Sequence, residues 1–301
     1  MIFEKCESTG NDFLIATMAD LEYEGITISP EGLSAVAQKV CDRHFGIGAD
    51  GLLLLDEPGN DRAGFGLYEK SDDAHCRMYL VNADGSHAEM SGNGSRCFSA
   101  YAAAHGYGTH SGDSHKVIME TLAGIKSVVL TADTRGTLHG DVDMGIALTE
   151  PAEIPLLADN SLDVPTELLG KMRQGIAVNS GVPHWVLVLD SHEELESPEL
   201  APQALLVRFD ERFPNTTNVS VVVVDSDERV TTRVFERGAD ETLSCGTGAT
   251  AIAAALHGAG LTKDKVSISL RGGDLTVALQ GDGTWLLGGP VRKIARCEFD
   301  L

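Results

Sequence analysis

The stretch that decides the fold is Ser244-Cys245-Gly246-Thr247-Gly248, which leads directly into the apolar run Ala249-Thr250-Ala251-Ile252-Ala253-Ala254-Ala255. This run has no polar face, so we expect a helix that is buried on every side. Cys245 then stands at the helix N-terminus, where unpaired N–H groups and the helix dipole favour both a thiolate and a bound carboxylate. This stretch alone leaves two interpretations open: a structural cysteine beside a helix cap, or a cysteine that acts as base or nucleophile.

A second copy of the pattern lies earlier in the chain, at Ser91-Gly92-Asn93-Gly94, and precedes another alanine-rich run. Other segments also match, since Gly10-Asn11-Asp12-Phe13 corresponds to Gly181-Val182-Pro183-His184. Asn82 stands nine residues before Ser91, as Glu236 stands nine residues before Cys245. Such self-similarity indicates a gene duplication. We therefore predict an α+β fold of two pseudo-symmetric domains, each a mostly antiparallel sheet or barrel wrapped around a central buried helix.

The duplication also predicts the domain boundaries. We expect an N-terminal half over residues 1–146, to which a C-terminal strand over 288–301 returns, and a C-terminal half over 147–287. Residues 149–168 are rich in proline and acidic side chains, and we interpret them as a linker between the halves. In a pseudo-twofold arrangement the two helix N-termini would face each other, which predicts an active site in the cleft between the domains.

Composition excludes several classes of function. The chain of 301 residues carries a formal net charge of −22 and has no cluster of Lys and Arg, which excludes wrapping of nucleic acid or adhesion to anionic lipid. It has neither a membrane-length apolar run nor a signal sequence at its N-terminus. The six cysteines are scattered, as expected of free thiols in a reducing compartment. We therefore predict a cytoplasmic protein that acts on a small molecule, with the oligomeric state open between monomer and homodimer.

We expect neither a cofactor nor a metal. Gly46-Ile47-Gly48-Ala49-Asp50-Gly51 matches the dinucleotide fingerprint, but it leads into an apolar strand rather than opening a helix, so a glycine-rich connection is the better interpretation. The histidines at 105, 110 and 115 recur every five residues, a spacing that does not align side chains on one helix face. Solvated loop histidines explain them better than a metal site does.

Two opposed helix N-termini suit one kind of chemistry. Inversion of an amino-acid stereocentre removes a weakly acidic α-proton from one face and returns a proton to the other. Without a cofactor, the reaction needs two opposed bases and strong stabilisation of the substrate carboxylate. Cysteine suits this role because a helix N-terminus can lower its pKa toward neutrality. Residues 91 and 245 would then lie on either side of the α-carbon.

The whole chain resembles the diaminopimelate epimerase family. The resemblance rests on Gly10-Asn11-Asp12-Phe13, Asn82-Ala83-Asp84-Gly85-Ser86, Gly92-Asn93-Gly94 with Arg96-Cys97, Pro183-His184, Glu236-Arg237-Gly238-Ala239 and Cys245-Gly246-Thr247-Gly248, with further matches at 42–50, Asn218 and Glu241-Thr242. It implies a cofactor-independent isomerase that interconverts LL- and meso-diaminopimelate on the route to lysine and peptidoglycan. The resemblance also implies that Asn11, Asn82, Asn218, Glu236 and Arg237 bind the substrate, while Gly92, Asn93, Gly246 and Thr247 hold the reacting carboxylate.

The sequence departs from the family pattern at the first catalytic position, where Ser91 stands in place of a cysteine. A hydroxyl is a far weaker acid than a thiol. Three explanations fit: an engineered substitution, a natural hydroxyl that relays protons through water or a neighbour, or an enzyme in which Cys245 is the sole strong base. Val182 and Gly51 also depart from residues common in the family, which leaves the distal end of the substrate open.

Other interpretations follow from these departures. The chain could be a related racemase, isomerase or dehydratase that acts on another small amino or hydroxy acid, or an inactive paralogue that binds a carboxylate. Single residues also have simpler explanations: an Asx turn at Asn82, a surface ion pair at Arg237, and a satisfied buried imidazole at His184. His184 could equally tune the thiol of Cys245.

Overall fold

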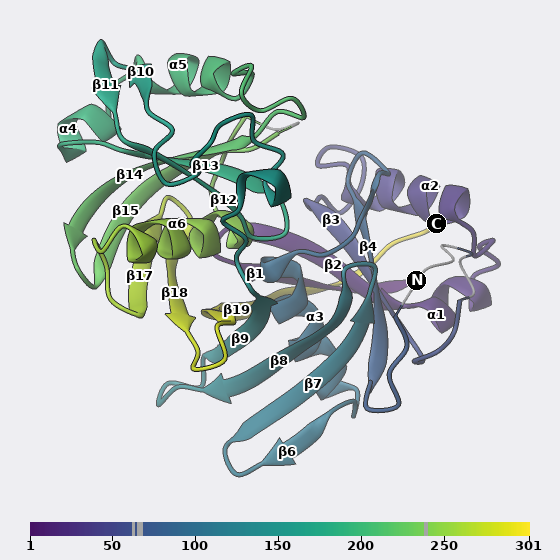
Figure 1. Ribbon diagram of the computed structural model, residues 1–301. Coiled ribbons are helices and arrows are strands. Elements are labelled where there is room, and N and C mark those ends of the chain that lie inside the picture. The colour runs from purple at the N-terminus through teal and green to yellow at the C-terminus, as the bar shows by residue number, and fades with distance from the viewer. Residues whose placement is uncertain (62–63, 65–68, 238–239) are drawn as a thin grey trace. The chain divides into compact units, whose positions relative to one another are not determined.

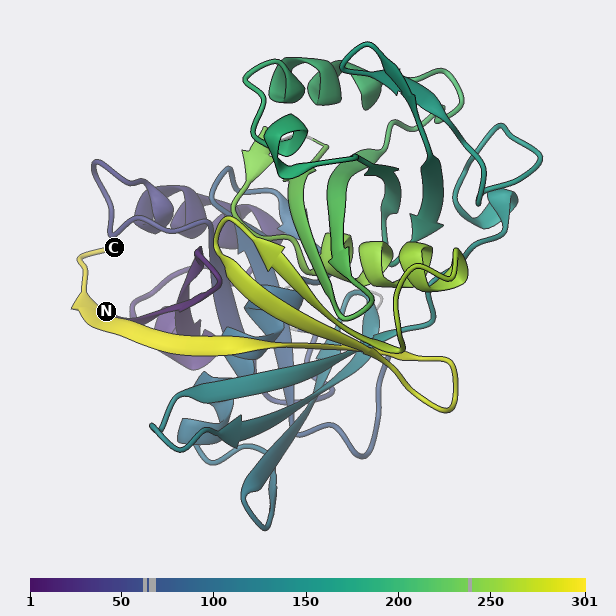
Figure 2. The same ribbon diagram turned by 90° about the vertical axis from the view of Figure 1, so that its left-hand side faces the viewer.

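The computed structural model of the chain describes residues 1–61, 64, 69–237 and 240–301. It divides into two compact units: unit 1 comprises Met1–Val142 and Gly289–Leu301, and unit 2 comprises Asp143–Gly288. The last strand, β19 (Trp285–Glu298), begins in unit 2 and ends in unit 1. The C-terminal segment therefore completes the unit in which the chain begins, and the amino group of Met1 donates a hydrogen bond to Phe299 O at 3.0 Å (Figure 2).

Unit 1 is a strongly curved sheet with one helix inside it and two outside (Figure 1). Its helices are α1 (Met18–Tyr23), α2 (Pro30–Cys41) and α3 (Gly92–Ala104). Its strands are β1 (Ile2–Ser8), β2 (Asn11–Thr17), β3 (Gly51–Asp56), β4 (Cys76–Asn82), β5 (His87–Ala88), β6 (Thr109–Ser111), β7 (Ser114–Thr121), β8 (Gly124–Ala132) and β9 (Leu138–Gly145), whose last residues pass into unit 2.

The strands of unit 1 pair in the order β19-β1-β2-β3-β4-β7-β8-β9. All neighbours are antiparallel except β2 with β3 and β4 with β7, which are parallel. Because β9 also pairs with β19, the sheet closes into a barrel of eight strands. Helix α3 contacts six of these strands, from β1 through β8, and is buried along most of its length.

Unit 2 repeats this plan. Its helices are η1 (Pro151–Glu153), α4 (His192–Leu195), α5 (Leu200–Val207) and α6 (Gly246–Gly258). Its strands are β10 (Thr166–Leu168), β11 (Lys171–Arg173), β12 (Gly175–Asn179), β13 (Pro183–Val188), β14 (Asn218–Ser226), β15 (Arg229–Phe235), β16 (Glu241–Thr242), β17 (Lys265–Leu270), β18 (Gly273–Leu279) and the start of β19. The main sheet follows the order β12-β13-β14-β15-β17-β18-β19 and wraps around α6 (Figure 1).

The registers of the two units agree residue by residue. In unit 1, Phe13 of β2 pairs in parallel with Gly51 of β3, which in turn stands opposite Asn82. In unit 2, His184 of β13 pairs in parallel with Asn218 of β14, and the register Val219–Phe235 places Asn218 beside Glu236. The predicted pseudo-symmetric α+β duplication is therefore confirmed, and Phe13 and His184 occupy equivalent positions.

The helices α3 and α6 begin where the sequence predicts. Ser91 and Cys245 are their N-caps, and each accepts a hydrogen bond from the N–H three residues on, as capping side chains do. Within α6, Gly246 and the residues from Gly248 to Leu256 are buried, which confirms the expectation of a helix without an exposed face.

The interpretation of residues 149–168 as a linker was wrong. Ile154, Leu156, Val164 and Leu168 are buried in the apolar core of unit 2, together with Trp185. The indole nitrogen of Trp185 donates to Val164 O at 2.9 Å, which ties the segment to β13. Proline and acidic residues mark the exposed turns of this segment, while every few positions an aliphatic side chain points into the core.

No helix in the described part of the chain is long and apolar enough to cross a membrane.

Candidate active site

The thiol of Cys245 lies at the first turn of α6 and is 5% exposed. Its Sγ accepts a hydrogen bond from Gly248 N at 3.3 Å, which completes the helix cap. A larger residue at 248 would crowd this turn, because a Cβ there would lie 3.2 Å from His184 Cε1 and 3.3 Å from Cys245 Sγ. The glycine thus lets a thiol and an imidazole approach the same helix turn.

Burial raises the pKa of the Cys245 thiol well above its ordinary value, and the Glu236 carboxylate beside it raises the pKa further. Hydrogen bonds with Thr247 and Gly248 act in the opposite direction but do not outweigh burial. The expectation that the helix N-terminus would lower this pKa is therefore not met in the free chain. Helix alignment is a modest effect, whereas full removal of a thiolate from water is a large one. The resting side chain is a neutral thiol.

His184 is fully buried on β13 and joins the thiol to Asn218. Burial, with the positive charge of Arg237, lowers its pKa to about 3, so the imidazole is neutral. Asn218 Oδ1 accepts from Arg237 N at 2.7 Å, which turns the amide nitrogen toward His184 Nε2 at 3.3 Å. Nε2 is therefore the acceptor nitrogen, and Nδ1 carries the proton and faces Ser220 Oγ at 3.5 Å.

Thr247 connects this acceptor to the thiol. Its hydroxyl lies 3.1 Å from His184 Nε2 and 3.3 Å from Cys245 Sγ. Since Nε2 can only accept, the Thr247 hydroxyl is a donor within reach of both the imidazole and the sulfur. His184 is thus both a satisfied buried histidine and a neighbour of the thiol through Thr247.

Glu236 and Arg237 follow β15 directly. Glu236 Oε1 accepts from the Thr242 hydroxyl at 2.7 Å, so one carboxylate oxygen is held by β16. The Arg237 guanidinium donates to Asn215 O at 3.3 Å. Five predicted residues of unit 2, namely Asn218, Glu236, Arg237, Cys245 and Thr247, are thereby linked with His184 into one polar cluster. Gly246 opens the helix turn beside them.

Unit 1 places Ser91 at the equivalent turn of α3. Ser91 Oγ accepts from Gly94 N at 3.1 Å, and a Cβ on Gly94 would lie 3.3 Å from Phe13 Cζ, just as Gly248 faces His184. Asn93 is buried in the same turn and accepts a short hydrogen bond from Arg96 Nη2. The unit therefore offers a hydroxyl where unit 2 offers a thiol, and a phenyl ring where unit 2 offers an imidazole.

Arg96 is a buried cation one turn into α3. Its Nε and Nη2 donate to Ser8 Oγ at 3.0 and 2.9 Å, and Nη1 has no partner among the described residues. Burial lowers its pKa to about 10, so it remains charged at neutral pH. No carboxylate of the described residues forms an ion pair with it, so its charge adds to the positive potential at the start of α3.

Asn11 extends this network toward the surface. Its Oδ1 lies 3.4 Å from Asn93 Nδ2, and its Nδ2 donates to Asp50 Oδ2 at 2.6 Å. Arg43 bridges Asp50 and Asp12 at 2.7 and 2.8 Å. Although burial opposes ionisation of Asp12, hydrogen bonds from Arg43 and Lys5 hold its pKa below the ordinary value. The array fixes the amide of Asn11 at the start of β2.

Asn82 stands apart from this network. Its Nδ2 donates to Ser86 Oγ at 2.9 Å, and its carbonyl accepts from Gly85 N at 2.9 Å. These contacts are those of a turn that joins β4 to β5, as the simpler interpretation of Asn82 expects. Asn82 nevertheless pairs with Gly51 in unit 1 as Glu236 stands beside Asn218 in unit 2, so Asn82 and Glu236 occupy equivalent positions.

A family model described as diaminopimelate epimerase matches residues 6–149 and 176–294 of the chain. The chain is 35% identical over 303 residues to the diaminopimelate epimerase of Caldanaerobacter subterraneus, with 100% of each chain covered. It is 36% identical over 291 residues to that of Archaeoglobus fulgidus, with 96% of this chain and 93% of the relative covered. The chain belongs to the diaminopimelate epimerase family. It is therefore an isomerase by family.

Solved structures with much lower sequence identity to this chain show the same fold. A hydroxyproline epimerase from Agrobacterium vitis with bound trans-4-OH-L-proline has a TM-score of 0.68 at 19% identity, covering 99% of this chain and 91% of that one. A phenazine biosynthesis protein of the PhzF family from Bacillus anthracis has a TM-score of 0.67 at 13% identity, with 100% and 99% covered. At these identities the likeness concerns architecture, and the diaminopimelate epimerase relatives carry the assignment.

Sequence reasoning missed some residues of the candidate site. Arg96 and Thr242 lie inside motifs that resemble diaminopimelate epimerase, but neither was assigned a role, although a charged residue within an apolar helix is a usable signal. Ser8 and Ser220 gave no signal in the sequence. Gly238 and Ala239, which belong to the Glu236-Arg237 motif, lie outside the described residues.

Proposed function

We propose that this chain converts LL-diaminopimelate to meso-diaminopimelate by proton transfer at the α-carbon, without an organic cofactor or a metal. The observation that carries the proposal is the equivalence of Cys245 and Ser91, which cap two buried helices at the same position of two units with the same register. Membership of the diaminopimelate epimerase family supports the choice of substrate. As the sequence predicts, the reaction would belong to the cytoplasmic route to lysine and peptidoglycan.

The first turns of α3 and α6 would hold the reacting carboxylate. The first N–H groups of a helix have no intrahelical acceptor. Gly92 and Asn93 in α3, and Gly246 and Thr247 in α6, supply such groups beside the two caps. A carboxylate that accepts from them gains charge-assisted hydrogen bonds and the favourable end of a helix dipole. The same donors stabilise the extra charge that develops on the carboxylate when the α-proton leaves.

The other end of the substrate would meet Asn11, Asn82, Asn218, Glu236 and Arg237. An ammonium group near Glu236 would neutralise the carboxylate that raises the pKa of Cys245. The bound substrate would thus remove one of the two causes that keep the thiol protonated. The thiol would then lose its proton to solvent more readily, and the thiolate fraction would be larger when substrate is bound.

Proton transfer would use the two caps in different ways. The Cys245 thiolate takes the α-proton from one face, and the Ser91 hydroxyl passes a proton from water to the other face. The new thiol releases its proton to solvent, and this proton neutralises the hydroxide formed when water reprotonates Ser91. The net change at the substrate is the replacement of one α-hydrogen by a solvent hydrogen with inversion.

The decisive experiment is incubation of LL-diaminopimelate with the protein in heavy water. We expect meso-diaminopimelate that carries deuterium at the inverted centre, and we expect Cys245→Ala to abolish both deuteration and inversion while thermal unfolding stays cooperative. Deuterium in LL-diaminopimelate without any meso isomer would overturn epimerisation in favour of one-sided exchange. A folded protein that exchanges no diaminopimelate isomer would overturn the assignment of the substrate.

A further inference from the structure

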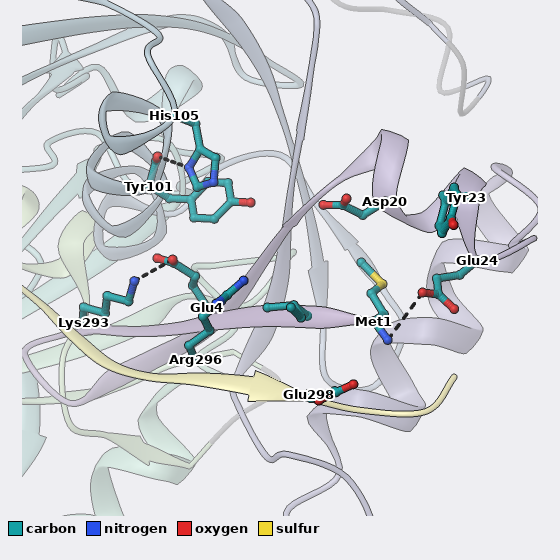
Figure 3. A pocket seen from close by; sticks show the side chains of 11 residues that line it. Met1, Glu4, Asp20, Tyr23, Glu24, Tyr101, His105, Lys293, Arg296 and Glu298 are labelled. Carbon is teal, nitrogen blue, oxygen red and sulfur yellow. Dashed lines mark hydrogen bonds and ion pairs between the residues drawn. The ribbon is translucent and has the colours of Figure 1, made fainter.

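A cavity of about 670 Å³ opens on unit 1. Its walls come from β1, α1, the C-terminal end of α3 and the last part of β19, and Figure 3 shows its lining. None of the residues predicted for the active site lines it. The size is within the range of small-molecule sites, which is about 300–1,000 Å³.

A largely buried tyrosine side chain directs its hydroxyl into this cavity. Tyr101, on the last turns of α3, is 6% exposed. Its hydroxyl forms no hydrogen bond with any residue that the structure describes, and a tyrosine whose ring is buried usually presents its hydroxyl to a partner. In Figure 3 this hydroxyl is directed toward the side chain of Asp20. Burial, followed by the charges of Asp20 and Glu4, raises the pKa of Tyr101, so the hydroxyl keeps its proton.

The carboxylates around the hydroxyl give this part of the cavity a negative character. Asp20 Oδ2 accepts from the Thr17 hydroxyl at 2.7 Å within the N-terminal cap of α1, and its other oxygen has no hydrogen bond to the described residues. Glu4 is paired with Lys293 at 2.6 Å. Arg296 is the cross-strand partner of Glu4 in the β1–β19 pair, and it makes no ion pair with the described part of the chain.

We propose that this cavity binds a small molecule that carries a primary ammonium group. Such a group has three N–H donors, and the carboxylates of Asp20 and Glu4 and the oxygen of Tyr101 are three acceptors among the residues that line the cavity. A ligand that also carries a carboxylate would direct it to Arg296. Free amino acids and alkyl diamines share the ammonium group, and Arg296 distinguishes between them.

Isothermal titration calorimetry of the full chain tests the proposal with three probes. L-lysine carries ammonium and carboxylate groups, 1,5-diaminopentane carries ammonium groups alone, and hexanoate carries a carboxylate alone. We expect both ammonium probes to bind and hexanoate not to bind. Tyr101→Phe removes only the hydroxyl, and it should weaken both ammonium probes about tenfold, because a hydrogen bond to a charged group is lost. Arg296→Gln should weaken L-lysine and leave 1,5-diaminopentane unchanged.

Enzyme kinetics distinguish binding in this cavity from binding at the proposed active site. Tyr101→Phe should keep the wild-type KM for LL-diaminopimelate, because Tyr101 is not among the residues assigned to that substrate. Asp20→Asn should weaken the ammonium probes at least as much as Tyr101→Phe does. If Asp20→Asn unfolds through loss of its helix cap, Tyr101→Phe decides alone. Affinity that survives Tyr101→Phe, or the absence of heat with both ammonium probes, would overturn the proposal.

Discussion

The charge of Glu236 controls the acidity of Cys245, and Glu236→Gln tests this directly. The substitution keeps an oxygen that can accept from Thr242, so the local geometry is preserved while the charge is removed. Because the carboxylate raises the pKa of the neighbouring thiol, its loss must lower that pKa. An adjacent charge is commonly worth at least about 1.4 kcal/mol between the two protonation states, which is about tenfold in thiolate. Burial still acts, so the pKa stays above its ordinary value.

The assay is the rate of alkylation of Cys245 by iodoacetamide as a function of pH, read by mass spectrometry of the peptide that contains it. We expect Glu236→Gln to react about tenfold faster than the wild type at neutral pH, because the thiolate is the reacting species. The half-exposed Cys297 serves as an internal reference in the same sample. Glu236→Asp keeps the charge and should react close to the wild-type rate.

Turnover should move in the opposite direction. Under the proposed function Glu236 also receives the substrate ammonium, so Glu236→Gln should raise KM for LL-diaminopimelate while the free thiol becomes more reactive. Alkylation of Glu236→Gln that is no faster than that of Glu236→Asp at every pH, with equal thermal stability, would refute the control of the thiol by this charge.

Three other substitutions follow from the same site. Ser91→Cys should raise α-deuterium exchange about tenfold or more, because a thiol is a much stronger acid than a hydroxyl; an unchanged rate would remove position 91 from the proton transfer. Arg96→Met should slow epimerisation about tenfold, since Asn93 loses its short hydrogen bond, while the free energy of unfolding falls by about 1–3 kcal/mol; wild-type kinetics would contradict this role. His184 has a pKa of about 3 in the folded chain and an ordinary value of 6.5, so the unfolded chain alone binds its proton between these values and stability falls as pH drops through that window. His184→Phe should therefore lose less stability than the wild type in urea unfolding between about pH 7 and pH 5; an equal loss would show that His184 is charged in the fold.

The duplication made the fold predictable from the sequence. Two similar stretches, each with glycines before an alanine-rich run, fixed the positions of α3 and α6 and of their caps. The equal offsets of Asn82 from Ser91 and of Glu236 from Cys245 indicated the duplication, and the structure explains them by equivalent strand registers before each helix. The expectation that the Gly46–Gly51 stretch leads into a strand was also confirmed, since β3 begins at Gly51.

Properties that depend on burial and on distant partners were not predictable. The acidity of Cys245 depends on the carboxylate of Glu236 and on the depth of the helix end, and neither can be judged from the residues around 245. The interpretation of residues 149–168 as a linker was wrong for a related reason. Its core side chains are spaced irregularly around turns, so neither the period of a helix nor that of a strand appears. The role of Arg96 was likewise not predictable, because its hydrogen-bond partner Ser8 lies far away in the sequence.

Ser91 and Cys245 occupy similar structural positions but differ in acidity. The charged residues around each of them reduce this difference in acidity. Ser91 is the weaker acid, but its helix carries the buried cation Arg96 one turn away, and positive charge favours an anion at that end. Cys245 is the stronger acid, but burial and Glu236 oppose its ionisation. Two-base proton transfer is efficient when the two acids are closely matched. We infer that duplication supplied two equivalent positions. The neighbours, Arg96 near Ser91 and Glu236 near Cys245, carry opposite charges and reduce the difference in pKa between the hydroxyl and the thiol.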